Sequence, residues 1–212
     1  MSDDVRESSH ASGAGNPFGD VVITAPKAMR ALAHPVRLAI LDLLRRNGPA
    51  SATELAPAAG ASPSVVSWHL RHLASFGLVR DSEPSADRRY RRWEAVGGFR
   101  FEVPERADDV EGRSAARLLS ELMFLQAGEV PVRWLTVTEP RLDPLWRRLA
   151  GVSNTGVVVS ADELAAIQAE LENVLAPYVT RDLIARPPGS RRVRLIRYDL
   201  PEDAGQAAGD PR

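Results

Sequence analysis

The chain has 212 residues, of which 44% are hydrophobic and 26% are charged, and its formal net charge is −1. These values are typical of one large or two small soluble domains. No apolar run approaches the ~20 residues of a membrane span, and no N-terminal segment joins a charged start to an apolar core, so we expect a cytoplasmic protein. The absence of Cys excludes thiol redox sensing.

Both ends of the chain are rich in small and polar residues. Residues 1–25 show no apolar period before Val21, which predicts a disordered arm, and residues 201–212 predict a disordered tail. After the arm, an apolar pattern between Pro35 and Asn47 predicts a helix that stops at Gly48-Pro49. His34 precedes this helix and is expected to cap it.

Residues 51–76 predict two short helices joined by a tight turn. Ser51 and Glu54 have the spacing of a capping box at the first helix, and Pro57 is expected to limit that helix to little more than one regular turn. Ser62 is the expected N-cap of the second helix, which ends before Gly77. The short connection between the helices is what a helix-turn-helix requires.

The second helix has two different faces. Val66, Leu70 and Leu73 share one side and are expected to be buried, with His69 packed beside them. The opposite side and its flanks suit the major groove of B-DNA, where polar side chains read base edges. We therefore predict DNA contacts from Ser62, Ser64, Val65, Ser67, Trp68, Arg71 and His72. Trp68 is expected to touch both DNA and the following β-ribbon.

Residues 78–96 predict a strand, a loop and a second strand. The second strand carries four arginines beside two aromatic residues, a pattern that suits a ribbon lying along a phosphate backbone. An edge strand kept soluble by its charges is the alternative. We predict phosphate contacts from Arg88, Arg89 and Arg91. Residues 27–96 hold eleven basic and six acidic residues, a net charge of +5 that favours phosphate contact.

Three segments resemble the winged helix-turn-helix domain of ArsR-type transcriptional regulators: AMRALAHPVRLAILDLL, ATELAPAAGASPSVVSWHLRHLASFGLV and RRYRRWEAV. The resemblance covers about residues 27–96. It implies a homodimer that binds a roughly palindromic operator, usually as a repressor released by an effector. With no Cys and no histidine pair at zinc spacing, we expect no metal site and no cofactor, and the chain is similar to the branch with an extended C-terminal half.

The fold class that these patterns predict is α+β, with a winged helix-turn-helix domain over residues 26–97 and a smaller α+β domain over residues 98–200. In the second domain, the apolar residues near 115–125 repeat at helical spacing. Leu118, Leu122 and Leu125 are the predicted dimerisation residues. The alternative is that this stripe packs inside its own chain.

The rest of residues 98–200 predicts strands at 132–137, 156–159 and 192–200 and helices at 143–150 and after the capping box of Ser160 and Glu163. This order would suit a ferredoxin-like sandwich. Trp134, Trp146 and Tyr178 are candidates for a pocket that binds a small-molecule effector of unknown identity, or are core residues.

The sequence therefore predicts a dimeric regulator, acting as a repressor, that reads an inverted-repeat operator in double-stranded DNA. The helix at 62–76 would lie in the major groove and the ribbon at 78–96 on the backbone. The alternative is a winged helix used for protein contact, as in an antitoxin or a sigma-factor partner. No polar titratable cluster indicates an enzyme.

Overall fold

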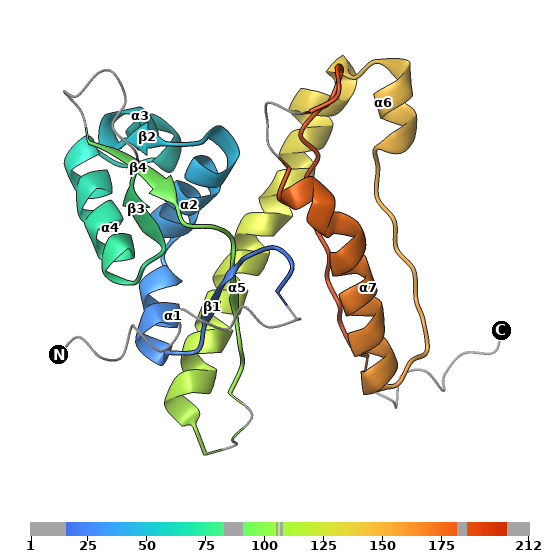
Figure 1. Cartoon of the computed structure of the whole chain (residues 1–212), viewed down its shortest axis with the longest axis horizontal. Helices are drawn as coiled ribbons and strands as arrows, with labels where there is room; N and C mark the ends of the chain where they lie inside the picture. Colours follow the sequence, from blue (N-terminus) through green and yellow to red (C-terminus); the bar gives the residue numbers. More distant parts are fainter. Residues whose placement is uncertain (1–15, 83–90, 105, 107, 182–185, 203–212) are drawn as a thin grey trace. The chain divides into compact units, whose positions relative to one another are not determined.

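The computed structural model describes residues 16–82, 91–104, 106, 108–181 and 186–202. The chain divides into two compact units, Met1–Thr180 and Arg181–Arg212. The larger unit contains all the helices and strands of the described residues (Figure 1).

The N-terminal part of the larger unit is built from four helices and a small sheet. The helices are α1 (Pro26–Leu32), α2 (Pro35–Asn47), α3 (Ala52–Ala59) and α4 (Pro63–Ser75). Strands β2 (Ala50–Ser51), β3 (Val79–Asp81) and β4 (Arg92–Ala95) form an antiparallel sheet in the order β2-β4-β3. Ala50 pairs with Trp93 and Val79 with Ala95. The β3–β4 hairpin directly behind α4 is the predicted wing.

A second sheet has two strands, one that precedes the four helices in the chain and one that follows the wing. Strand β1 (Val21–Ile23) runs parallel to β5 (Phe99–Phe101), with Val21 opposite Phe99. Helix α5 (Val110–Arg133) then packs along α1 and buries Ala115, Ala116 and Leu119 (Figure 1). The long helix is therefore part of the core of the N-terminal domain.

The helix starts follow the sequence closely. His34 caps α2, because its Nδ1 accepts a hydrogen bond from the backbone N–H of Val36 at 3.2 Å. Ser51 and Glu54 form the predicted capping box at α3. The expected effect of Pro57 was wrong: α3 has eight residues despite the proline inside it. The capping box at one end and the left-handed Gly60 at the other hold the helix around the lost hydrogen bond.

The later part of the chain differs from the predicted ferredoxin-like sandwich. The predicted strand at 132–137 is helical, because α5 runs to Arg133 and continues as a wider turn, η2 (Trp134–Thr138), then η3 (Glu139–Arg141). The Thr136 hydroxyl donates to the carbonyls of Val132 and Arg133, which supports the helical backbone. Residues 156–159 and 192–200 are described and belong to neither sheet. The α+β class is confirmed, whereas this particular topology was wrong.

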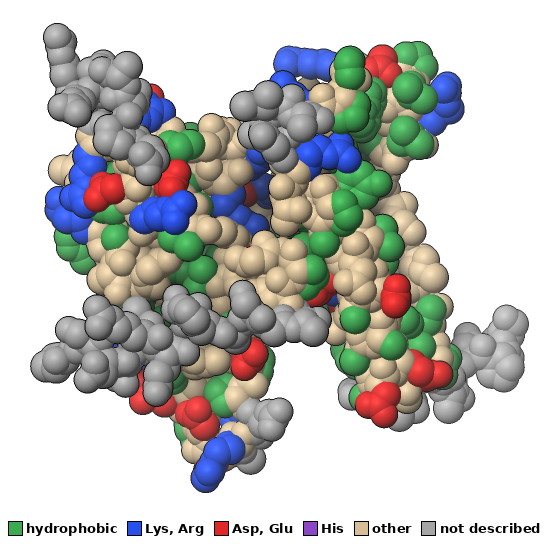
Figure 2. All heavy atoms as spheres, in the orientation of Figure 1, with side chains coloured by type: hydrophobic (Ala, Val, Ile, Leu, Met, Phe, Trp, Pro, Cys, Tyr) green, Lys and Arg blue, Asp and Glu red, His purple; other side chains and the backbone are tan. Residues whose placement is uncertain are grey.

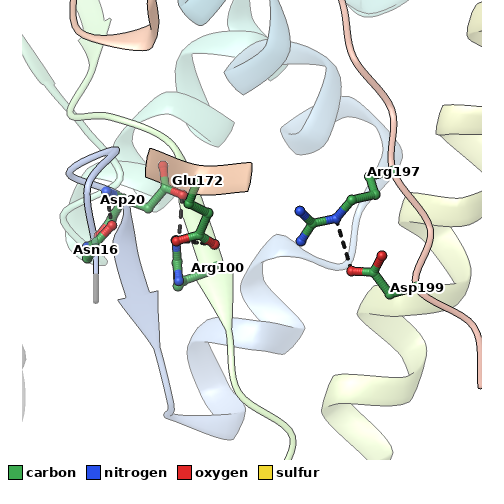
Figure 3. A network of polar contacts seen from close by, with 6 residues as sticks. All are labelled: Asn16, Asp20, Arg100, Glu172, Arg197 and Asp199. Carbon is green, nitrogen blue, oxygen red and sulfur yellow. Dashed lines mark hydrogen bonds and ion pairs between the residues drawn. The ribbon is translucent and has the colours of Figure 1, made fainter. Parts of the chain in front are cut away.

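Two helices complete the larger unit. Helix α6 (Pro144–Leu149) matches the prediction at 143–150, and α7 (Ala161–Val179) begins with the predicted capping box of Ser160 and Glu163. Arg100 of β5 contacts Glu172 of α7 at 3.3 Å (Figure 3). In the smaller unit, Arg197 pairs with Asp199 at 3.0 Å (Figure 3).

Replacing Leu70 with alanine should destabilise the protein by about 2–5 kcal/mol, because the side chain is fully buried in the domain core. The matched variant Val65→Ala, five residues earlier on the exposed side of α4, should change the free energy of unfolding by about 0.5 kcal/mol or less. Urea unfolding measures both values. Equal losses in the two variants would contradict the assignment of the buried face.

Candidate nucleic-acid interface

The turn between α3 and α4 presents the start of α4 to the outside of the domain. Gly60 ends α3 in the left-handed conformation, with φ 67° and ψ 31°, which glycine adopts without a steric penalty. Ser62 then caps α4, its hydroxyl oxygen accepting from the N–H of Val65 at 3.4 Å. The exposed first turn carries Ser62, Ser64 and Val65. The local sequence alone fixes this turn.

Helix α4 divides into buried and exposed faces as the spacing predicts. Val66, Leu70 and Leu73 are completely buried, and His69 is 4% exposed. The residues predicted to contact DNA lie on the other side: Ser62, Ser64, Val65, Trp68 and Arg71 are exposed, and Ser67 and His72 are half-buried. The structure thus brings all seven predicted residues of this helix to accessible positions.

A hollow of about 220 Å³ lies between α4, the start of α3 and the wing. Arg71 points toward Ser67 of its own helix, with Nη1 donating to the Ser67 hydroxyl at 3.2 Å. The lining residues are Ser51, Ala52, Thr53, Ser67, Arg71, Arg91 and Trp93. The sequence reasoning missed Thr53, and it gave Ser51 only a capping role. Both residues lie at the start of α3, where Ser51 is the N-cap and Thr53 is in the first turn, and this position in the motif was the signal available.

The described arginines of the wing are paired with carboxylates. Arg91 donates to Asp81 from Nη2 at 2.8 Å, and its guanidinium lies 4.2 Å from the centre of the Trp93 ring. This hydrogen bond lowers the pKa of Asp81 and raises the pKa of Arg91. Arg80 pairs with Glu94, and Arg92 with Glu54. Acidic and basic side chains therefore alternate on this surface (Figure 2).

Because these arginines are ion-paired, the net charge of this segment does not by itself give the number of arginines that are available to bind a phosphate. A phosphate could draw Arg91 away only by replacing Asp81, and exposed pairs of this kind contribute little to stability. Arg88, Arg89 and Tyr90 lie outside the described residues.

Trp68 has partners on its own helix. Its ring stacks on His72 with centroids 5.4 Å apart and planes 4° from parallel, and it meets the edge of His69 at 4.9 Å. The side chain is still 53% exposed. We expected Trp68 to pack on the ribbon near Tyr90 or Trp93; Trp93 is buried and lies beneath Arg91, and Tyr90 lies outside the described residues.

The predicted dimerisation residues have different environments. Leu118 and Leu125 are 45% and 70% exposed, whereas Leu122 packs partly against the core of its own chain. Of the candidate effector residues, Trp134 and Trp146 are half-buried and Tyr178 is exposed. Both assignments remain predictions.

Among the described residues, no group of three or more His, Cys, Asp or Glu side chains could hold a metal ion. None of the helices in the described ranges has the length and apolar character needed to cross a membrane.

The capped helix pair and its hairpin form a winged helix-turn-helix domain. A family model for a helix-turn-helix domain matches residues 32–81. The chain is 53% identical over 51 residues to the HTH-type transcriptional regulator NmtR of Mycobacterium tuberculosis, a match to 24% of this chain. The chain spans 42% of the length of that curated relative. Residues 32–81 are therefore a helix-turn-helix domain similar to that of a transcriptional regulator, in agreement with the resemblance found in the sequence.

Two solved structures show a weaker likeness. A MarR family regulator from Neisseria meningitidis has a TM-score of 0.30 at 19% identity, over 66% of this chain and 78% of its own. A transcriptional regulator homologue from Pyrococcus horikoshii OT3 has a TM-score of 0.30 at 26% identity, over 48% and 93%. Likeness at this level says nothing about how the chains act.

The capping box should make part of the stability depend on pH. The backbone N–H of Ser51, followed by its hydroxyl and by Arg92, lowers the pKa of Glu54 from its ordinary value of 4.5. The stabilisation is therefore present above pH 4.5 and is lost as the pH falls through the lower pKa of the folded state. Urea unfolding should show the wild type losing its advantage over Glu54→Gln in that range.

Glu121→Gln is the control for this prediction, since it removes one acid from an exposed pair with Arg117 on α5. If that variant and Glu54→Gln differ from the wild type by the same pH-dependent amount, the capping box has no special role.

Proposed function

We propose that the protein is a dimeric, sequence-specific DNA-binding transcriptional regulator that acts as a repressor. Helix α4 would lie in the major groove of an inverted-repeat operator, and the wing would lie along the backbone. The observation that carries the proposal is the accessible face of α4, with Ser67 and Arg71 sharing a hollow with Arg91 of the wing. A base-reading group and a phosphate-binding group thus stand beside one another.

The chemistry of this face suits the edges of base pairs. Arg71 can donate two hydrogen bonds to a guanine, the serine hydroxyls can donate or accept, and Val65 can meet a thymine methyl group. Among the described residues, Arg71 makes a single exposed hydrogen bond, to the uncharged hydroxyl of Ser67, so turning it toward DNA breaks one contact. Arg91 would serve as a phosphate contact after exchanging its carboxylate partner.

The alternative is a winged helix that binds a protein, which the paired charges of the wing and the exposed Trp68 would also suit. Salt dependence separates the two. DNA binding should weaken steeply with salt, with a slope of about −0.9 per phosphate contact in a plot of log K against log salt concentration. Selection of bound fragments from genomic DNA followed by salt titration is the direct test. Absence of any salt-dependent fragment would favour the protein-binding alternative.

Two arginine variants should affect DNA binding in different ways. Arg71→Ala should cost about 1–3 kcal/mol on the selected site and relax the preference at one base pair, while Arg91→Ala should weaken all sequences and reduce the salt slope by about one unit. Fluorescence anisotropy on specific and scrambled duplexes measures both effects.

Arg106→Ala is the matched control, because Arg106 is an exposed arginine that is ion-paired with Asp108 and belongs to neither α4, nor the wing, nor the proposed dimer helix α5. If all three variants bind both duplexes like the wild type, this docking of α4 is wrong.

Dimerisation should depend on the exposed side of α5. Leu118→Asp combined with Leu125→Asp should give a monomer that protects half of the operator, because two charges would have to be buried at the interface. Sedimentation velocity measures whether the variant is a monomer or a dimer. Val152→Asp, at a position 90% exposed and outside any helix, is the control. A double variant that stays dimeric would place the interface elsewhere.

A further inference from the structure

A cluster of basic side chains, with Arg37 and His69 buried and His34 half-buried, lies where α4 packs against the start of α2. The rings of His34 and His69 lie 4.6 Å apart between centroids. His69 is 4% exposed, and Arg37 is 8% exposed. The Arg37 guanidinium reaches the backbone carbonyl of Arg30 at 3.4 Å, but its buried Nε, like the buried Nδ1 of His69, has no hydrogen-bond partner in the part of the chain that the structure describes.

Among the described residues, no carboxylate acts on either ring of this cluster. The charged groups that act on His69 are His34, Arg37 and His72, and Arg37 also acts on His34. Six described acids on the elements packed against α2 and α4 pair with other arginines: Asp42 with Arg46, Glu54 with Arg92, Asp81 with Arg91, Glu94 with Arg80, Glu111 with Arg30 and Glu121 with Arg117. Glu129 of α5 is exposed and does not act on either ring. A proton added to either ring would therefore enter a buried and already positive environment.

The role of His34 as a cap makes this environment more sensitive to acid. Its Nδ1 can accept the hydrogen bond from Val36 only while the ring is neutral. Protonation removes that acceptor and places a positive charge at the positive end of the α2 dipole. The same proton would thus weaken the start of α2 and repel Arg37 and His69.

We propose that His34, Arg37 and His69 form an acid-sensitive lock that holds the DNA-reading helix α4 against α2. Protonation of the imidazoles opens the lock, loosens α4 and lowers its affinity for DNA. The consequence for DNA rests on the proposed function, whereas the loss of packing on acidification does not.

The direction follows from the pKa values of the two histidines. Burial, and then the charges of His34, Arg37 and His72, lower the pKa of His69 from its ordinary 6.5 to about 4. Burial and Arg37 lower the pKa of His34 in the same direction. The opened state therefore binds a proton first. The contribution of the lock to stability is fully present above pH 6.5 and falls as the pH drops toward 4. Over this range, the equilibrium constant for opening rises by up to about tenfold per pH unit for each histidine.

Urea unfolding between pH 7.5 and 5.0 tests the lock without DNA. His34→Asn keeps a side chain that can cap α2 but does not titrate, and His69→Phe fills the same site without a buried unpaired nitrogen. In the double variant, the rise of the unfolding constant on acidification should be at least about tenfold smaller than in the wild type. His34→Asn alone should show part of this effect, so the test stands even if His69→Phe does not fold.

His10→Gln is the control, because it also removes one titrating imidazole and lies outside the described residues. A double variant as acid-sensitive as the wild type would overturn the lock, and so would equal protection by His10→Gln.

Titration of the same variants with the selected DNA at pH 7.5 and 5.5, at fixed salt, tests the link to DNA. The wild type should lose more affinity on acidification than the double variant. Both retain His72 on the DNA face, and its protonation favours phosphate binding in each. Equal losses would overturn the link to DNA. If neither protein binds DNA at either pH, the proposed function fails, while the urea measurement still decides the lock.

Discussion

The packing of Val66, Leu70 and Leu73 against the other helices is the constraint on which the rest of the domain depends. These three side chains are completely buried, so they fix both the position of α4 and its rotation about its own axis. At about 100° per residue, this rotation decides that Arg71 faces outward and His69 inward. A one-residue change in the buried stripe would exchange these roles and leave an arginine in the core, at a large desolvation cost.

Features set by local interactions could be predicted from the sequence. The two capping boxes, the N-cap roles of His34 and Ser62 and the buried stripe of α4 all depend on residues within a few positions of one another. Residues 132–137 could not be assigned in this way. Their apolar alternation fits a strand, but a strand also needs a partner, and here the backbone of α5 simply continues as a helix.

The candidate site, too, could be predicted only where it depends on local sequence. The faces of α4 followed from its spacing, whereas the hollow joining Ser67 and Arg71 to Arg91 depends on how β4 pairs with β2 and β3. The contact between His34 and His69 joins residues 35 positions apart in sequence, and no periodicity connects them. The carboxylate partner of each wing arginine likewise depends on the register of the hairpin.

Helix α4 thus carries opposite electrostatic demands on its two faces. On the proposed DNA-binding face, a positive charge is favourable, and protonation of His72 would strengthen contact with phosphate. Toward α2, the same charge on His69 is unfavourable because Arg37 and His34 are already there. The ring of Trp68 contacts both His69 and His72 across this boundary. Because a helix moves as a rigid element, a change in the packing of His69 would displace the side chains on the proposed DNA-binding face, so the two faces would not respond to acid independently.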